Sequence, residues 1–437
     1  MFVNYVRNTE RPSPINLALA RFVVGFWLVW KTIWYDWGRI VATPYQDAVT
    51  VAHQWAIPAA APWLLTVEKY LLVVLLCLFV VGYRTRITAA VSSLVLAHLA
   101  TVRATLVATG ETQNIFLGTM ILIFFALYAD EDELSLDGLR RIDNRSLDST
   151  VGRLTDDGDE RFEMSALRYS LLFIALLYFS SGLSKVVQGG GLGFVVPDNL
   201  ARLVLVRSYV YPWSDLPLVI VEYPALATLG GIGTLVLELG LLVALLAGVL
   251  YTPLLAGLML FALSNAAILG IFFADNLFIL ALFLAWDDAY ARTLTDRSLT
   301  VVFDDRCLLC VRALYPFELL DTADTVAFVP QGAAPDRYRE RDGVDFDSAM
   351  YAFHDGTAYE GYDAFVELFR QFRVFFPVVW LLSLPPVERV GTRVYRYVAD
   401  NRGRQFACRP ETGLYPDDDT DLGRATNDRA GDSGRQK

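Results

Sequence analysis

Residues 164–187 of this chain read MSALRYSLLFIALLYFSSGLSKVV. This run is apolar over about the 20 residues that a helix needs to cross the hydrocarbon core of a bilayer. It is apolar throughout instead of alternating, which favours a spanning helix over a strand of a barrel. Similar runs recur along the chain, and we predict about eight spans, near residues 15–36, 63–82, 87–107, 114–129, 164–187, 229–250, 253–272 and 274–286, of which the last is short.

The apolar runs stop near Trp286, and the rest of the chain is polar. The mean hydropathy of the whole chain, +0.39, is too high for an ordinary soluble domain. We therefore predict an α-helical polytopic membrane bundle over residues 1–290, followed by a soluble part. No cleavable signal peptide is expected, because the first apolar run begins at Ile15 and is too long for a signal-peptide core.

The formal net charge is −11, and of the 37 basic residues only Lys31, Lys69, Lys185 and Lys437 are lysines. Such an acidic, lysine-poor composition resembles that of proteins from salt-loving archaea. A nucleic-acid partner is not expected, because phosphate binding requires clustered cations.

Arginine placement predicts the orientation of the bundle. With an even number of spans, the arginine-bearing segments all lie on one side, which the positive-inside rule makes the cytoplasm. We therefore expect a multi-pass protein of the cell membrane, in contact with lipid, whose N- and C-termini are both cytoplasmic. The arginines concerned are Arg7, Arg11, Arg84, Arg86, Arg140, Arg141, Arg145, Arg153 and Arg161.

Several ionisable residues fall within predicted spans, where such groups usually face a cavity or a partner, and four of them are candidate functional residues. Arg21, His98 and Arg103 are candidate cofactor-binding residues; snorkelling of the arginines and an interior hydrogen bond of the histidine are the alternatives. Lys185 ends the fifth span. Burial there would disfavour its charged form and provide a neutral amine as a base, unless it snorkels to the interface.

Two segments of the bundle resemble a known family. Residues 98–137 combine a polar patch, a Gly-acidic turn, an apolar span and the tripeptide SLD, and residues 177–186 read LYFSSGLSKV. Both are similar to the HTTM (horizontally transferred transmembrane) family, which is related to the vitamin K-dependent gamma-carboxylases. The resemblance implies that Lys185 is a base and that the bundle binds a hydrophobic substrate such as a quinone. Peptide carboxylation is not expected, since the large lumenal domain of the carboxylases has no counterpart.

The C-terminal part is predicted to be a thioredoxin-like α/β domain over residues 299–405. Residues 299–303 form a β-branched strand, and the pair Cys307-Leu-Leu-Cys310 opens a helix. Further strands at 325–329 and 350–353, a turn at 354–356, and helices at 362–373 and 387–401 complete the pattern. Residues 411–437 are expected to be a disordered acidic tail.

The spacing of Cys307 and Cys310 permits a disulfide between them, and the helix N-terminus stabilises a thiolate on the first. Cys307 is then the attacking thiolate and Cys310 the resolving thiol. Asp304 would relay the proton of Cys310, or alternatively cap the turn.

Three segments resemble the DCC family of thiol-disulfide oxidoreductases, named for its Asp-x-x-Cys-x-x-Cys motif. They read FDDRCLLC (303–310), GYDAF (361–365) and LPPVERVGTRVYRYVADNR (384–402). The resemblance implies a redox-active dithiol with a thiol partner, either a protein or a small thiol. Asp305 stands where that family commonly has glycine.

Alternatives remain for the cysteines. Cys307, Cys310, His354 and Cys408 would make a Cys3His zinc set, and an inert cysteine pair is a further reading; we expect no metal. Cys77 is interpreted as a small apolar residue of a span.

These features predict a membrane-bound thiol-disulfide oxidoreductase whose dithiol is linked to a quinone or another hydrophobic substrate in the bundle. The alternative is a lipid-binding or carrier module with a redox-sensing or zinc-stabilised cytoplasmic domain.

Overall fold

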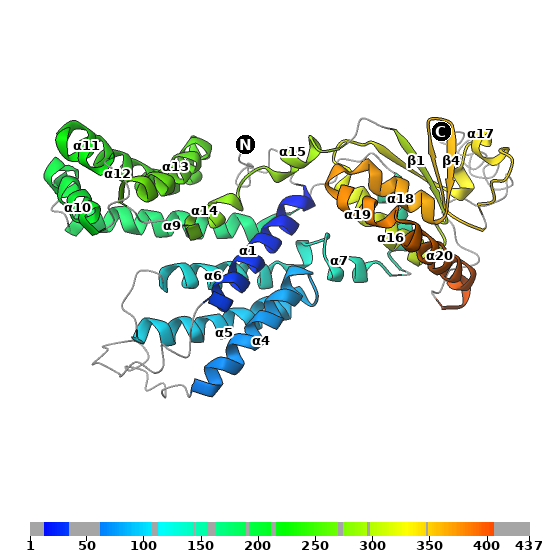
Figure 1. Cartoon of the computed structure of the whole chain (residues 1–437), viewed down its shortest axis with the longest axis horizontal. Helices are drawn as coiled ribbons and strands as arrows, with labels where there is room; N and C mark the ends of the chain where they lie inside the picture. Colours follow the sequence, from blue (N-terminus) through cyan, green and yellow to red (C-terminus); the bar gives the residue numbers. More distant parts are fainter. Residues whose placement is uncertain are drawn as a thin grey trace, which may run out of the picture. The chain divides into compact units, whose positions relative to one another are not determined.

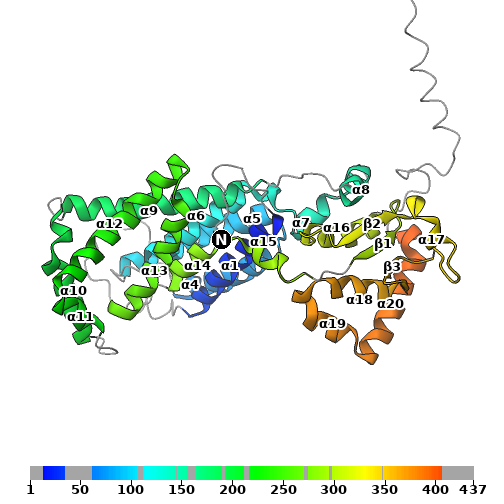
Figure 2. The same cartoon turned by 90° about the horizontal axis from the view of Figure 1, so that it is seen from above.

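The chain forms two compact units in this computed structural model (Figures 1 and 2). The first comprises Met1–Gly138 and Glu160–Trp286, and the second Leu139–Asp159 and Asp287–Lys437. The segment 139–159 lies inside the predicted 1–290 bundle but groups with the C-terminal unit. The structure describes residues 13–34, 62–106, 112–143, 145–155, 163–188, 192–210, 216–269, 274–294, 298–346 and 348–405. The predicted tail 411–437 lies outside them.

The first unit is a bundle of helices with an apolar core. Leucine is the commonest residue of that core, which also contains aromatic pairs such as Phe79 and Phe125, whose ring centroids lie 5.4 Å apart in an edge-to-face arrangement. Its long helices are α1 (Pro14–Trp34), α4 (Pro62–Val80), α5 (Thr85–Leu106), α6 (Thr112–Leu127), α9 (Ser165–Gln188), α12 (Pro224–Ala247) and α13 (Tyr251–Leu269). Its shorter helices are η1 (Ala129–Glu131), η2 (Leu192–Val195), α10 (Pro197–Val210), α11 (Leu216–Glu222) and α14 (Ala274–Ala281).

Six helices among the described residues are long and apolar enough to cross a membrane: α1, α4, α5, α9, α12 and α13. A polytopic helical membrane bundle is therefore confirmed, but with fewer clear spans than the eight predicted. The two that fall short are α6, whose apolar part is residues 116–127, and α14, which has 8 residues.

Hydrogen bonds nevertheless show that α6 and α14 carry the chain back across the bundle. Leu136 N donates to Val81 O over 3.3 Å, so the end of α6 lies beside the α4–α5 turn from which α5 departed. Trp286 N donates to Asn16 Oδ1 over 2.9 Å, which brings the end of the bundle back to the start of α1. Ser165 N donates to Glu131 Oε2 over 2.7 Å, so α9 also starts at this level. The start of α1, the α4–α5 turn and the start of α9 thus lie at one end of the bundle.

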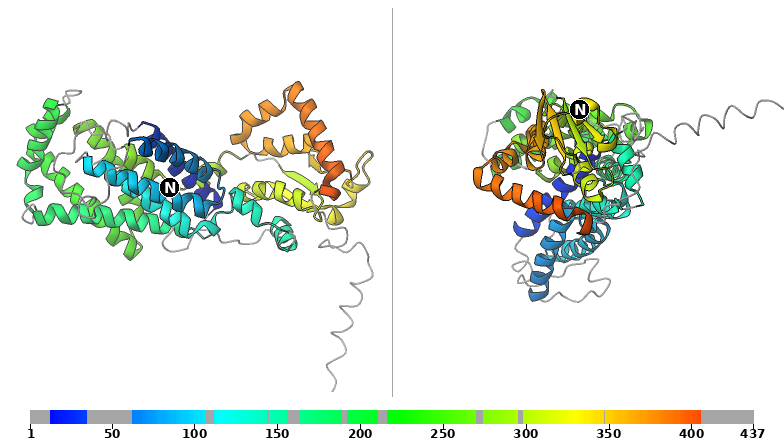
Figure 3. Two further views of the ribbon diagram at one scale, coloured as in Figure 1. Left: turned by 90° about the horizontal axis from the view of Figure 1, so that it is seen from below. Right: turned by 90° about the vertical axis from the view of Figure 1, so that its right-hand side faces the viewer.

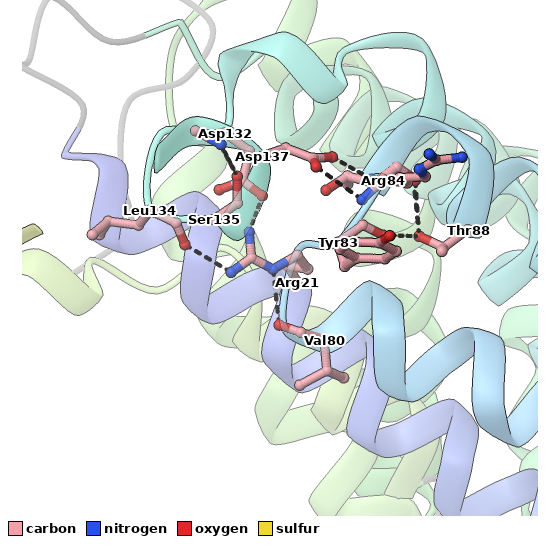
Figure 4. Close-up of polar contacts among 11 residues, drawn as sticks. Arg21, Val80, Tyr83, Arg84, Thr88, Asp132, Leu134, Ser135 and Asp137 are labelled. Atoms are coloured by element: carbon pink, nitrogen blue, oxygen red, sulfur yellow. Dashed lines mark hydrogen bonds and ion pairs between the residues drawn. The ribbon is translucent and has the colours of Figure 1, made fainter. Parts of the chain in front are cut away.

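Arg21 joins three of these segments (Figure 4). Its side chain is only 6 % exposed and forms an ion pair with Asp132. Its Nε donates to Val80 O over 3.1 Å and its Nη2 to Leu134 O over 2.8 Å. A guanidinium in a low-dielectric site requires such a set of acceptors, and the set here ties α1 to the end of α4 and to the segment after α6.

The tripeptide Ser135-Leu-Asp137 belongs to the same turn (Figure 4). The Asp137 carboxylate accepts the backbone N–H groups of Arg84, over 2.9 Å, and Thr85, over 2.7 Å, which caps the N-terminus of α5. Ser135 Oγ donates to Asp132 O over 2.7 Å and accepts from Gly138 N over 2.9 Å. In this chain the tripeptide therefore has a structural role, because it satisfies backbone groups at helix ends.

The second unit contains a four-stranded mixed sheet of order β2-β1-β3-β4. Strand β1 (Leu299–Phe303) pairs in parallel with β2 (Val326–Pro330) and antiparallel with β3 (Tyr351–His354), which forms a hairpin with β4 (Thr357–Glu360). This confirms the α/β thioredoxin-like class. Its helices are α8 (Leu147–Thr155), α15 (Trp286–Ala291), α16 (Leu308–Leu320), η3 (Gln331–Ala333), α17 (Asp336–Arg339), α18 (Tyr362–Gln371), η4 (Arg373–Phe375), α19 (Phe376–Leu382) and α20 (Pro385–Gln405); α7 (Leu136–Arg141) lies at the boundary of the units.

Different segments pack on the two faces of the sheet. Paired residues of neighbouring strands share a face, so Val302 and its partner Tyr351 lie together, and this face packs against residues 334–346. Tyr338 stacks on Phe353 at 4.2 Å between ring centroids. Helix α18 packs on β1, β3 and β4, and meets α16 through aromatic rings. The helix that carries the cysteines is thereby held against the sheet.

The burial of Arg21 makes a testable stability prediction. We expect Arg21→Ala to lower the free energy of unfolding by about 3–5 kcal/mol, because it leaves the buried Asp132 carboxylate uncompensated. The measurement is denaturant unfolding of the detergent-solubilised protein followed by circular dichroism. Arg86→Ala is the matched control: its pair with Asp130 is solvent-exposed, so the loss should stay below about 1 kcal/mol. Equal losses in the two variants would contradict the assignment.

Candidate functional site

The cysteine pair lies at the connection between the end of β1 and the start of α16. The parallel pairing of β1 and β2 requires a crossover, and α16 supplies it. Strand β1 ends at Phe303, a three-residue turn follows, and Cys307 occupies the N-cap position of α16. Cys310 lies within the first turn of the same helix. Both sulfurs are therefore near the positive end of the helix dipole, which stabilises thiolates.

Asp304 organises the turn before the cysteines. Its Oδ1 accepts Arg306 N over 3.0 Å, and its carbonyl oxygen accepts Cys307 N over 3.3 Å. These bonds agree with the turn-capping interpretation of Asp304. The proton relay from Asp304 to Cys310 stays a prediction. Asp305, which stands where the DCC family commonly has glycine, is buried.

The two thiols differ in access. Neither is joined in a disulfide; Cys307 is 0 % exposed, whereas Cys310 is partly exposed. Thiol exchange requires collinear approach of an external sulfur atom. The position of Cys307 at the helix N-terminus favours it as the attacking thiolate. Because Cys307 is buried, a local opening must precede the attack.

A segment between two bundle helices packs on the helix of the cysteines. Arg312, two residues after Cys310, donates through Nε and Nη2 to Ile142 O over 2.8 and 2.5 Å. Arg153 Nη1 donates to Tyr315 Oη over 2.8 Å. We predicted nothing for these residues beyond the orienting charge of Arg153. The available signal was the spacing of Leu147, Val151 and Leu154, which form the buried face of α8.

The far end of α16 carries buried ionisable groups. Asp321 accepts Val326 N over 2.6 Å and Thr325 Oγ1 over 2.8 Å, which fixes the turn into β2. Burial raises the pKa of Asp321 despite these bonds, and burial together with the Asp321 charge raises the pKa of Tyr290. These groups are at the opposite end of the helix from the cysteines, so they support the fold and not the exchange chemistry.

Lys185 and His98 each meet an acidic residue that we had not singled out from the sequence. Lys185 Nζ donates to both oxygens of Glu238, over 2.7 and 2.6 Å, and to Ser181 Oγ over 2.8 Å. Glu238 is buried on α12. His98 Nδ1 lies 2.9 Å from Glu68 Oε2. Beyond the predicted set, Lys31 pairs with Asp275, whose Oδ1 also accepts Trp27 Nε1 over 2.7 Å.

The structure does not bring the predicted cofactor-binding residues together. Arg21 binds Asp132, His98 binds Glu68 and Lys185 binds Glu238, at three separate contacts of the bundle. The side chain of Arg103 lies outside the described residues, as does Cys408. His354 Nδ1 lies 3.1 Å from Ser298 O. In the part of the chain that the structure describes, no three His, Cys, Asp or Glu side chains are grouped so as to hold a metal ion.

Comparison with known families decides the class of the C-terminal unit. Residues 301–408 match the DCC1-like thiol-disulfide oxidoreductase family. The match begins within β1, includes both cysteines and extends past the end of α20. The C-terminal part of the chain thus carries a DCC1-like thiol-disulfide oxidoreductase domain. No curated protein and no solved structure matches the chain.

The unequal burial of the two thiols in the DCC1-like domain predicts unequal reactivity. We expect a maleimide to modify Cys310 at least about tenfold faster than Cys307, because an opening that costs about 1.4 kcal/mol slows a reaction by that factor. Brief labelling of the reduced protein and peptide mass spectrometry measure both rates. In denaturant the rates should converge. Faster labelling of Cys307 in the native protein would show that its burial does not limit access.

Proposed function

We propose that this protein is a membrane-bound thiol-disulfide oxidoreductase that uses Cys307 and Cys310. The observation that carries the proposal is the position of both thiols in the first turn of α16, after β1 of a thioredoxin-like sheet, within the segment that matches the DCC1-like family. The six long apolar helices of the first unit support a location of this activity at a membrane.

The exchange begins with reduced protein and an oxidised partner. The Cys307 thiolate attacks one sulfur of the partner disulfide, which forms a mixed disulfide and releases a partner thiolate. Cys310, once deprotonated, attacks Cys307 Sγ, which closes the Cys307–Cys310 disulfide and releases the second partner thiolate. Two electrons pass to the partner, and the two protons of the dithiol are left for the partner's thiolates. The reverse sequence oxidises a dithiol partner.

Asp304 has two roles in this scheme. Its side chain and carbonyl oxygen hold the turn that presents Cys307 at the helix end. Its carboxylate lies in the turn that precedes α16, and it also accepts the Cys310 proton before the second step. A partner with a disulfide on a protein or a small molecule satisfies the chemistry equally.

A redox titration tests the proposed dithiol. We expect a reversible two-electron transition that joins Cys307 to Cys310, at a potential within about −120 to −270 mV, the range of known oxidoreductases. The protein is equilibrated in dithiol/disulfide buffers, alkylated and analysed by mass spectrometry. Thiols that resist oxidation and alkylation until a chelator is added would support the zinc alternative and end the enzyme proposal.

Single serine variants separate the roles of the two cysteines. Cys310→Ser should accumulate a mixed disulfide on Cys307, because the resolving step is lost, whereas Cys307→Ser should not trap a partner. A mixed disulfide that forms only in Cys307→Ser would reverse the two roles while leaving the dithiol chemistry in place.

For the bundle we propose binding of a hydrophobic substrate, on the carboxylase-like resemblance and on the polar group around Lys185. Glu238 and Ser181 hold the Lys185 ammonium at the α9–α12 contact. Gly182 allows this close approach, since a Cβ there would lie 2.9 Å from Leu239 and 3.1 Å from Glu238 Cβ. As a base, Lys185 would first have to pass a proton to Glu238. A quinone is the substrate class that would link this site to thiols.

The alternative function, a carrier or lipid-binding module with a redox sensor, makes a different prediction for the same residues. A sensor is oxidised once per dithiol, without turnover, whereas an oxidoreductase cycles with an excess of partner. Multiple-turnover kinetics with an excess of disulfide substrate separates the two.

Variants of the Lys185–Glu238 pair test its role in the bundle. We expect Lys185→Ala to lower the free energy of unfolding by about 3–5 kcal/mol, because Glu238 is left buried and uncompensated. The double variant Lys185→Ala/Glu238→Gln should recover part of this loss, which a double-mutant cycle measures. If purified protein carries no quinone, and thiol turnover in the folded double variant equals that of the wild type, the quinone link fails.

A further inference from the structure

The helices α19 and α20 at the end of the DCC1-like domain leave large apolar side chains uncovered. Phe376 is 71 % exposed and Trp380 62 % exposed, one helical turn apart, and Leu381 beside them is 49 % exposed. Valines and leucines scattered singly on a surface need no explanation, but two aromatic rings grouped with a leucine indicate a binding surface.

Helix α20 continues this apolar surface. One side of α20 is packed: Tyr395 lies against Phe365, at 6.2 Å between ring centroids, and Tyr395 Oη accepts Met350 N over 3.0 Å. The other side carries Val390, Val394 and Tyr397, which follow the i, i+4, i+7 spacing of a single helix face and are all more than half exposed. The fold therefore holds α20 by one face and leaves this stripe outward.

A basic stripe runs beside the apolar one. Arg389, Arg393 and Arg396 repeat at the same spacing, one residue before each apolar position, and all are exposed. Residues 373–405 contain six arginines but only two acids, Glu388 and Asp400, within a chain of net charge −11. This concentration of positive charge fits an anionic partner.

A cavity of about 360 Å³ lies where α18 meets α19. Two arginines and three apolar residues line it: Arg370, Phe372, Arg373, Phe376 and Val379. Arg370 pairs with the buried Glu367 over 2.9 Å. The guanidinium of Arg373 makes no hydrogen bond or ion pair with any residue that the structure describes. The combination of cationic and apolar lining fits a headgroup phosphate next to the start of an acyl chain.

We propose that α19 and α20 form an interfacial membrane-binding element, which seats the DCC1-like domain on the surface of an anionic phospholipid bilayer. A bend of 91° separates the two helices, which together have the length and hydropathy of a span. Figure 3 shows the bent pair in orange. The arginine stripe of α20 is costly within the hydrocarbon core but favourable at the headgroup level. The indole of Trp380 is suited to that level too, and the apolar ring of Phe376 is suited to the boundary between headgroups and acyl chains. The proposal does not depend on the redox chemistry of the domain.

Photo-crosslinking in the full-length protein tests this surface. p-Benzoylphenylalanine replaces Phe376 or Trp380, and the protein is reconstituted into vesicles of phosphatidylcholine with or without phosphatidylglycerol. Glu340, an exposed residue of the same domain, is the matched control position. We expect phospholipid adducts at positions 376 and 380, at least about fivefold above position 340 and increasing with phosphatidylglycerol. Fivefold is the effect of one arginine near an anionic surface.

A charge variant completes the test. Arg389→Gln/Arg393→Gln/Arg396→Gln should lower the adduct yield at position 380 by at least about fivefold in anionic vesicles. A thermal unfolding midpoint equal to that of the wild type, followed by circular dichroism, would show that the charge variant is folded. Adducts with a second protein copy would overturn the proposal in favour of a dimer interface. Three other results would overturn it as well. They are lipid adducts at position 340 equal to those at positions 376 and 380, no lipid adducts at positions 376 and 380, and an adduct yield that changes neither with the charge variant nor with phosphatidylglycerol.

Discussion

The arrangement of the bundle depends on the burial of the Arg21 guanidinium. An unpaired cation at that depth would be expelled, so Arg21 can be buried only while Asp132 and the carbonyl oxygens of Val80 and Leu134 surround it. Those acceptors come from the end of α4 and the segment after α6. Their positions in turn bring the start of α5, capped by Asp137, to the same level. One charged residue thus sets the level at which several helices begin and end.

The chain that leaves this cluster enters the second unit. Between α6 and α9, residues 139–155 pack on α16 through Ile142 and Arg153, and they form part of the C-terminal unit although they lie between two bundle helices in sequence. Any movement of α16 that opens access to Cys307 must be accommodated by these contacts. The helix that carries the cysteines therefore packs directly on the connection between α6 and α9.

Sequence patterns predicted those features that depend on local periodicity and spacing. The long apolar runs gave the main spans, and the order strand, Cys-x-x-Cys, helix, strand, hairpin, helix gave the thioredoxin-like unit. Patterns did not predict which acid would meet each buried cation, because Glu68 and Glu238 lie 30 and 53 residues from their partners. The docking of α8 on α16 was missed for the same reason: an amphipathic face shows that a partner exists, but not which one. A continuous apolar run also predicted a spanning helix over residues 274–286, whereas α14 has only 8 residues.

The position of Lys185 constrains how the two parts can cooperate. Helix α9 starts at Ser165, which is bonded to Glu131 at the end of the bundle where Trp286 meets Asn16 and the chain departs for the second unit. Lys185 is 20 residues further along α9, about 30 Å at the rise of an α-helix. Thiol exchange is a reaction between sulfur atoms, and neither Lys185 nor Glu238 carries one, so this pair cannot perform it directly. The quinone proposed for the bundle is a diffusible carrier, and such a carrier would link the two sites without contact between them. Without it, the chain joins a thiol site and a bundle site that act separately.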